Sequence, residues 1–224
     1  MNSQLRCVHR HTIKEHPSCF AAGLVKYRND REFEKLTGQP WFKMPGTKIG
    51  YLDIEVDNLN ADFGSLLSWC IKERGGETAY DVVTKEDLFN GTLDKRVVQS
   101  CVDEMSKYDI IVGYYTERFD MPYVRAKAMH YNIDFPGYGD VYHWDLYFLV
   151  RAKLKISSRS LANACDYLNI KGKTPIDKDI WRRAKYGDPE ALAEVLSHNI
   201  ADVEITEQLH DRLSFTRSWS RKSL

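Results

Sequence analysis

The stretch Lys48-Ile-Gly-Tyr-Leu-Asp-Ile-Glu-Val56 has the composition of a β-strand that carries two acids. Its β-branched and aromatic residues favour an extended backbone, and apolar and polar positions alternate along it. Leu52 and Ile54 therefore share one face, and Asp53 and Glu55 share the other, about 7 Å apart at Cα. Two carboxylates buried this close repel each other, which indicates a cation between them. The stretch predicts a strand whose acids bind a metal ion.

The composition is that of an ordinary globular chain. Among 224 residues, 43% are hydrophobic, and 32 Lys and Arg balance 32 Asp and Glu. Net charge therefore neither favours nor excludes a polyanionic partner, and any basic surface must come from local clustering. No apolar run approaches the ~18 residues that span a membrane, and the first residues lack a signal-peptide core. We expect a cytoplasmic protein, or a viral protein in the host cytoplasm, whose five Cys form no disulfide framework.

The N-terminal arm concentrates Cys and His in the pattern C-x-H-x-H-x4-H-x2-C. Four such ligands close a tetrahedral structural zinc site, which can order a segment poor in apolar residues. The predicted ligands are Cys7, His16, Cys19 and one of His9 or His11, with His11 favoured because its wider spacing from Cys7 leaves room for chelation. Two alternatives stay open: a polar arm in which these residues are incidental, and a disulfide between Cys7 and Cys19.

The order of elements after residue 47 predicts a mixed α/β layer fold. The predicted domains are an arm and connector at 1–46, one main domain at 47–213 and a basic, frayed tail at 214–224. A hairpin at Gly75-Gly76 should join two strands. Beyond the first strand, we expect strands at 65–72, 77–83 and 109–114, helices at 94–107, 122–131, 146–155, 160–168 and 188–213, and a loop, with or without a last strand, at 134–145.

Two further places offer acids that such a fold can bring to the first strand. Asp120 begins a helix after an apolar strand, and Asp202 lies in the last long helix, one turn after His198. At 100° per residue, Asp202 falls roughly 70° and His198 roughly 110° from the middle of that helix's apolar stripe. Asp202 should sit at the edge of the buried stripe and His198 on the outward side of the same flank. The alternative is a surface Asp–His pair of a few tenths of a kcal/mol.

Four such carboxylates suit a two-metal site for phosphodiester cleavage, with two cations about 4 Å apart. Oxygen ligands predict Mg²⁺ or Mn²⁺ rather than zinc. His198, whose side chain ordinarily titrates near neutral pH, is a candidate to deprotonate the attacking water.

Three ordered motifs resemble those of the DEDD superfamily of 3′–5′ exonucleases: DIE at 53–55, GYYTERFDMPYV at 113–124 and HNIAD at 198–202. The likeness is closest to the exonuclease domains of family B DNA polymerases and related stand-alone nucleases, and it covers about residues 47–213. Residues 144–170 and 181–196 also look like the corresponding segments of that group. The resemblance implies a ribonuclease H-like mixed sheet of about five strands flanked by helices. It also implies a metal-binding quartet of Asp53, Glu55, Asp120 and Asp202.

The chain departs from the family pattern at two positions. His198 lies four residues before Asp202, which combines the spacing of the Tyr-containing branch with the residue type of the His branch. Tyr115 stands where the second motif often carries Asn. Tyr115 and Phe119 are candidates to stack on nucleobases, although aromatic residues at a strand end are also common core residues.

These features predict a metal-dependent 3′–5′ exonuclease that acts on single-stranded or frayed DNA ends. Nucleic acid is the expected partner, DNA more than RNA. Basic stretches at 151–159 and 171–173 either line a phosphate path or form a solvated face. Two alternatives stay open: an RNA-directed or structure-specific nuclease of the same fold, and a nucleic-acid-binding adaptor with an inactive site.

Overall fold

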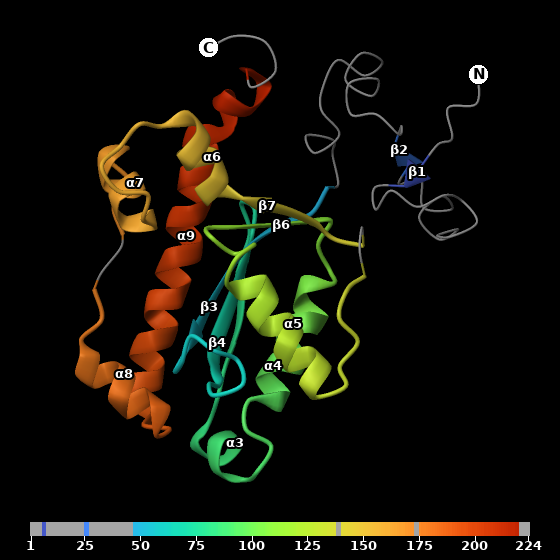
Figure 1. The fold of residues 1–224 in the computed structure, drawn as a ribbon, viewed down its shortest axis with the longest axis vertical. Coiled ribbons are helices and arrows are strands. Elements are labelled where there is room, and N and C mark those ends of the chain that lie inside the picture. The colour runs from blue at the N-terminus through green and yellow to red at the C-terminus, as the bar shows by residue number, and fades with distance from the viewer. Residues whose placement is uncertain (1–5, 8–24, 27–46, 138–139, 173–174, 220–224) are drawn as a thin grey trace.

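A five-stranded mixed sheet with the order β5-β4-β3-β6-β7 organises the protein (Figure 1). The structure, a computed structural model, describes residues 6–7, 25–26, 47–137, 140–172 and 175–219. The central strand β3 pairs antiparallel with β4, which pairs antiparallel with β5, whereas β6 and β7 run parallel to β3. This arrangement confirms the predicted mixed α/β fold. The strands are β3 Ile49–Val56, β4 Leu66–Glu73, β5 Thr78–Val82, β6 Ile110–Gly113 and β7 Tyr142–Asp145.

The central strand β3 separates two apolar cores, as its alternating sequence predicts. Leu52 and Ile54 pack into one core with residues of α4 (Lys95–Met105) and α5 (Asp120–His130). Tyr51 packs into the other with residues of the long helix α9 (Pro189–Trp219). The face of β3 that carries Asp53 and Glu55 is therefore the face that α9 covers.

The antiparallel half of the sheet holds its register through a tight hairpin and a bulge. Gly75 adopts a φ of +66° in the predicted hairpin, a backbone conformation that Gly tolerates without steric cost. The β3–β4 register pairs Asp53 with Cys70 and then shifts between Glu55 and Val56. Bulges of this kind re-aim a side chain and are common beside functional sites.

The remaining helices begin at recognisable caps. Ser160 accepts a hydrogen bond from the N–H of Asn163, as predicted, and Asp188 accepts two at the start of α9. Two short helices, α3 and α8, were not predicted, although Thr84 and Asp177 cap them in the same way. No helix in the described ranges is long and apolar enough to cross a membrane. The bounds are α3 Lys85–Phe89, α6 Leu146–Lys153, α7 Leu161–Tyr167 and α8 Lys178–Lys185.

Two helices begin or end at residues other than those predicted. Helix α5 begins at Asp120, two residues earlier than predicted, so the acid itself belongs to the first turn. The last helix was predicted to end at about residue 213, whereas α9 continues to Trp219. Residues 220–224 lie outside the described part of the chain.

The N-terminal arm is described only as a pair of short strands, β1 (Arg6–Cys7) and β2 (Val25–Lys26), which pair antiparallel. The predicted zinc ligands His11, His16 and Cys19 lie outside the described residues, and Cys7 is described only as backbone. The zinc site therefore stays a prediction.

Candidate metal centre

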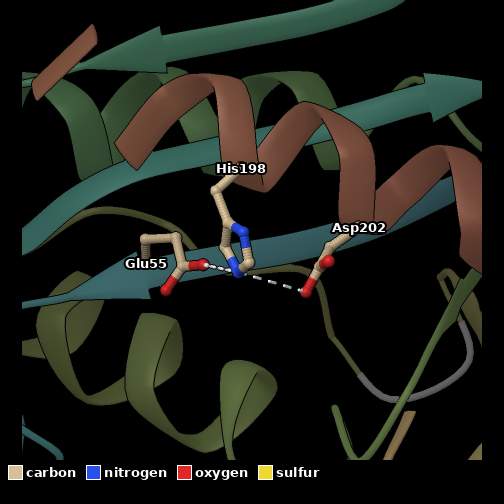
Figure 2. Close-up of side chains that lie close together, drawn as sticks. All are labelled: Glu55, His198 and Asp202. Carbon is tan, nitrogen blue, oxygen red and sulfur yellow. Dashed lines mark ion pairs between the residues drawn. The ribbon is translucent and has the colours of Figure 1, made fainter. Parts of the chain in front are cut away.

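Three side chains from two elements converge over the end of β3: Glu55 from the strand, and His198 and Asp202 from α9 (Figure 2). The Nε2 atom of His198 lies 3.8 Å from Oε1 of Glu55 and 3.8 Å from Oδ2 of Asp202. One candidate ligand atom from each of the three lies within 4.8 Å of the others. Asp202 is only 4% exposed, so its charge is largely removed from water. Two largely buried carboxylates this close to one imidazole make a candidate cation site.

The position of His198 differs from the prediction that it lies on the outward side of α9. The side chain of His198 is only 11% exposed, close to the 6% exposure of the Asp202 side chain taken without its backbone. The imidazole is turned toward β3 and lies between the two carboxylates (Figure 2). The surface-pair alternative is therefore wrong, since neither side chain is on the surface.

A buried amide holds α9 against the strand that carries the acids. In the orientation that matches donors with acceptors, the Asn199 amide donates to the carbonyl of Asp53 at 3.2 Å. Its oxygen accepts from the N–H of Glu55 at 3.3 Å and from the hydroxyl of Ser68 at 3.2 Å. Asn199 is fully buried, so these bonds fix how far His198 and Asp202 stand from β3. The sequence signal for this role is an Asn in the middle of a helix, where Asn has low intrinsic preference.

Asp53 lies on the same strand face as Glu55, as predicted, but it is not part of the close group. It stands opposite Cys70 in the β3–β4 ladder. Burial raises the pKa of the Cys70 thiol, and the nearby charges of Asp53 and Glu55 raise it further. The negative potential of the two acids thus extends over this face of the sheet.

Asp120 reaches β3 from α5, the helix that follows β6. The pairing of β6 with β3 ends at Tyr51, and Oδ1 of Asp120 accepts a hydrogen bond from the N–H of Ile54 at 3.1 Å. Asp120 therefore caps the strand where its parallel partner stops. It is 4% exposed, and burial raises the pKa of its carboxyl to about 7 despite this bond. Asp120 also lies outside the close group, so the full quartet remains a proposal.

The raised pKa of Asp120 predicts a specific pH dependence of stability. Between the ordinary value of 3.8 and about 7, the folded chain holds a proton on Asp120 that the unfolded chain has released. Its contribution to the free energy of unfolding therefore falls as pH rises through this window. Asp120→Asn cannot titrate, so in EDTA its melting temperature should increase relative to wild type as pH is raised from 4 to 7. A difference that is constant or decreases over that range would contradict the assignment.

The two predicted base-stacking residues occupy different environments. Tyr115 is 45% exposed and adopts a φ of +67°. Phe119 is half-buried, packs against the core and contacts the ring of Tyr123, with centroids 5.8 Å apart. Exposure supports the stacking prediction at Tyr115, whereas the contacts of Phe119 favour its alternative role as a core residue.

Asp145 is a further residue that the sequence did not reveal. Its carboxylate accepts hydrogen bonds from the N–H groups of Tyr115, Glu117 and Tyr147, each at 2.9 Å. One side chain at the end of β7 thus shapes the turn that precedes Asp120 and also caps α6. The cap of α6 is local, but no local pattern signals the bonds to Tyr115 and Glu117, which cross 30 and 28 residues of sequence.

The donor atoms in this region suit a hard divalent cation. Carboxylate oxygens outnumber the single imidazole nitrogen of the close group, and Asp53 and Asp120 add further carboxylates from adjoining positions. Mg²⁺ and Mn²⁺ prefer such oxygen-rich sets, whereas structural zinc sites are usually built from thiolates and imidazoles.

Comparison with known proteins agrees with this fold. A family model of the RNase H superfamily, RNase_H_2, matches residues 50–214. The chain belongs to the RNase H superfamily. RNase H-like proteins are typically nucleases that use divalent metal ions, and the superfamily implies a nucleic-acid substrate.

Among solved structures, this RNase H superfamily member is similar to the family B DNA polymerase of the hyperthermophilic archaeon Pyrobaculum calidifontis. The TM-score is 0.63 at 21% sequence identity, over 75% of this chain and 25% of the polymerase. The chain thus corresponds to about a quarter of that protein, and the likeness is one of fold. No curated protein sequence matches the chain.

Proposed function

We propose that the chain is a divalent-metal-dependent 3′–5′ exonuclease that hydrolyses phosphodiester bonds at the ends of single-stranded DNA. The observation that carries this proposal is the convergence of Glu55, His198 and Asp202 at the end of the central strand of an RNase H-like sheet. The likeness to part of a family B DNA polymerase supports an exonuclease that acts on DNA.

The acids proposed to hold two Mg²⁺ or Mn²⁺ ions are Asp53, Glu55, Asp120 and Asp202. When bound, such ions activate a water and stabilise the leaving oxygen of the cleaved bond. The acids come from three elements, β3, α5 and α9, so the relative placement of these elements sets the geometry of the site. Asn199 and the bond between Asp120 and Ile54 hold that placement.

The proposed role of His198 is that of the general base. Its Nε2 lies between two carboxylates, which favour the protonated ring once it has accepted a proton from water. A neutral imidazole can accept that proton near neutral pH, and the adjacent acids orient its ring.

Digestion of end-labelled strands tests the proposed polarity and substrate. With Mn²⁺, a single-stranded DNA labelled at its 5′ end should yield a ladder of progressively shorter products. The same strand labelled at its 3′ end should release labelled mononucleotide from the earliest times. EDTA should abolish both, and Asp53→Ala should do so without loss of the fold.

Other outcomes of this digestion identify the alternatives. Faster digestion of the matching RNA would make the chain an RNA-directed nuclease, and internal cuts at strand junctions would make it a structure-specific endonuclease. Binding of the strand without metal-dependent cleavage would contradict an enzyme and favour the adaptor. Asp53→Ala activity equal to wild type would contradict the metal assignment.

A further inference from the structure

Four aromatic side chains gather at the edge of the sheet where β3 ends. Tyr114 and Tyr115 directly follow β6, and Tyr147 and Phe148 lie in α6, directly after β7. Because β6 and β7 run parallel to β3, their carboxyl ends lie at the same edge as Glu55. We call these four residues the aromatic shelf.

The rings of the aromatic shelf meet edge to face instead of stacking on one another. The centroids of Tyr115 and Tyr147 are 4.8 Å apart at an interplanar angle of 78°, and those of Tyr114 and Tyr147 are 6.0 Å apart at 86°. Tyr147 and Phe148 meet at 82°. Rings at right angles form a corner, in which a flat ligand on one ring meets the edge of another.

An open pocket of about 570 Å³ lies against this corner. This volume is within the range of small-molecule sites and accommodates a nucleoside. The hydroxyl of Tyr114 donates to the carbonyl of Arg159 at 2.6 Å, which joins the aromatic shelf to the segment before α7. The pocket is lined by Tyr114, Tyr115, Tyr147, Arg159, Ser160 and Leu161.

The backbone at Tyr115 is held in a conformation that keeps its ring accessible. Its φ of +67° is one that side chains other than Asn and Asp rarely adopt. The carboxylate of Asp145 accepts from the N–H of Tyr115 and from that of Tyr147, so the same group positions both rings. Tyr115 as a residue is 45% exposed, so burial does not compensate for the backbone strain. An exposed ring on a strained backbone indicates a functional role for that ring.

Positive charge flanks the aromatic shelf on two sides. Arg159 lines the pocket, and the guanidinium of Arg118 lies 6.0 Å from the ring centroid of Phe148. Arg151 in α6 and Lys155, two residues after its end, are also exposed. Two acids lie equally near in sequence: Glu117, exposed beside Arg118, and Asp145, whose carboxylate accepts from the N–H groups of Tyr115 and Tyr147. Aromatic faces combined with cations are the pattern that binds single-stranded nucleic acid.

We propose that the aromatic shelf binds an unpaired nucleobase of a nucleic-acid strand, with Tyr115 and Tyr147 contacting the base and Arg159 the adjacent phosphate. The proposal rests on the proposed function for the identity of the strand, which then continues into the metal centre. Contact with the base needs no metal ion, so the two proposals can fail separately. Stacking accepts any base, which suits an enzyme that degrades a strand regardless of sequence.

Fluorescence anisotropy of a labelled oligothymidylate of twelve nucleotides, measured in EDTA, tests the aromatic shelf. Tyr147→Ala and Tyr115→Gly should each weaken binding by about 5- to 150-fold, the range of base–aromatic stacking. Gly tolerates the positive φ of position 115 without steric cost, so that variant should keep the fold. Tyr167→Ala, at a tyrosine of α7 that is more exposed than either and does not line the pocket, should bind as wild type does.

A strand of abasic sugars separates base contact from a structural role. Wild type should bind it about as weakly as the Tyr variants bind the normal strand, and the substitutions should then change little. Equal losses on both strands, variant affinities within twofold of wild type, or no binding by wild type would overturn the proposal. Oligouridylate in parallel shows whether the preferred strand is DNA or RNA. If the Tyr variants lose binding and wild type shows no Mn²⁺-dependent cleavage, the aromatic shelf proposal stands. The exonuclease proposal would then be refuted.

Discussion

Asp202→Asn is expected to lower the rate of Mn²⁺-dependent strand degradation by roughly 1000-fold or more. Asp202 is 4% exposed on α9, and its Oδ2 lies 3.8 Å from His198. Asn has the same shape but no charge, so it loses a carboxylate proposed to bind metal while α9 stays in place. Metal ions contribute several kcal/mol to transition-state stabilisation, and each 1.36 kcal/mol is a factor of ten in rate. The initial rate on 5′-labelled single-stranded DNA measures the effect.

Glu204→Gln is the matched control for this substitution. Glu204 lies on the same helix two residues away and is exposed, so its charge is screened by solvent. Its rate should stay within about twofold of wild type, as expected for a surface substitution that makes no buried contact. Asp202→Asn activity within tenfold of wild type, with both variants folded, would remove Asp202 from the proposed metal centre.

Asp94→Ala is expected to lower the free energy of unfolding by about 3–5 kcal/mol, the cost of leaving a buried charge without its partner. Asp94 is fully buried, and Nζ of Lys127, itself 5% exposed, lies 3.1 Å from its Oδ2. The same carboxylate accepts from the hydroxyl of Tyr131 at 2.5 Å and from the N–H of Leu66 at 2.6 Å. Lys127 also donates to the carbonyl of Gly64, which ties the loop after β3 to α5. Urea denaturation measures the loss.

Two variants separate the buried charge of Asp94 from the general effect of removing an acid in this region. Asp103→Ala removes an exposed acid of α4, the helix that Asp94 directly precedes, and should change the free energy of unfolding by less than about 0.5 kcal/mol. The double variant Asp94→Asn/Lys127→Met removes both charges and should be more stable than Asp94→Ala alone. A double variant less stable than Asp94→Ala would contradict the view that Lys127, left charged and unpaired, causes the loss.

Periodicity was sufficient to predict the elements that carry the site. The two-residue alternation of β3 placed Asp53 and Glu55 on one face, and the structure covers that face with α9. The helix predicted at 94–107 was likewise correct, since α4 spans Lys95–Met105 and buries apolar side chains along one side. These features follow from local repeats, which any amphipathic element must have in order to bury one side.

The contacts that position the site could not be predicted in the same way. Asn199 bridges α9 to β3, Asp145 binds the backbone of Tyr115, and Asp120 caps Ile54. Each contact joins residues that are far apart in sequence, so no local pattern reveals the partner, even where an Asn in the middle of a helix signals a buried role. His198 was placed outward from its angle on an isolated helix, but docking of α9 on β3 leaves it only 11% exposed. A motif supplies the positions of the acids and not the directions of their side chains.

The central claim is that Asp53, Glu55, Asp120 and Asp202 together bind catalytic divalent cations. Calorimetric titration of the purified chain with Mn²⁺ near neutral pH, beside Asp202→Asn, tests this claim most directly. We expect wild type to bind two Mn²⁺ ions and Asp202→Asn to lose at least one of them. Wild type that binds no Mn²⁺, or Asp202→Asn that binds it as wild type does, would contradict the claim.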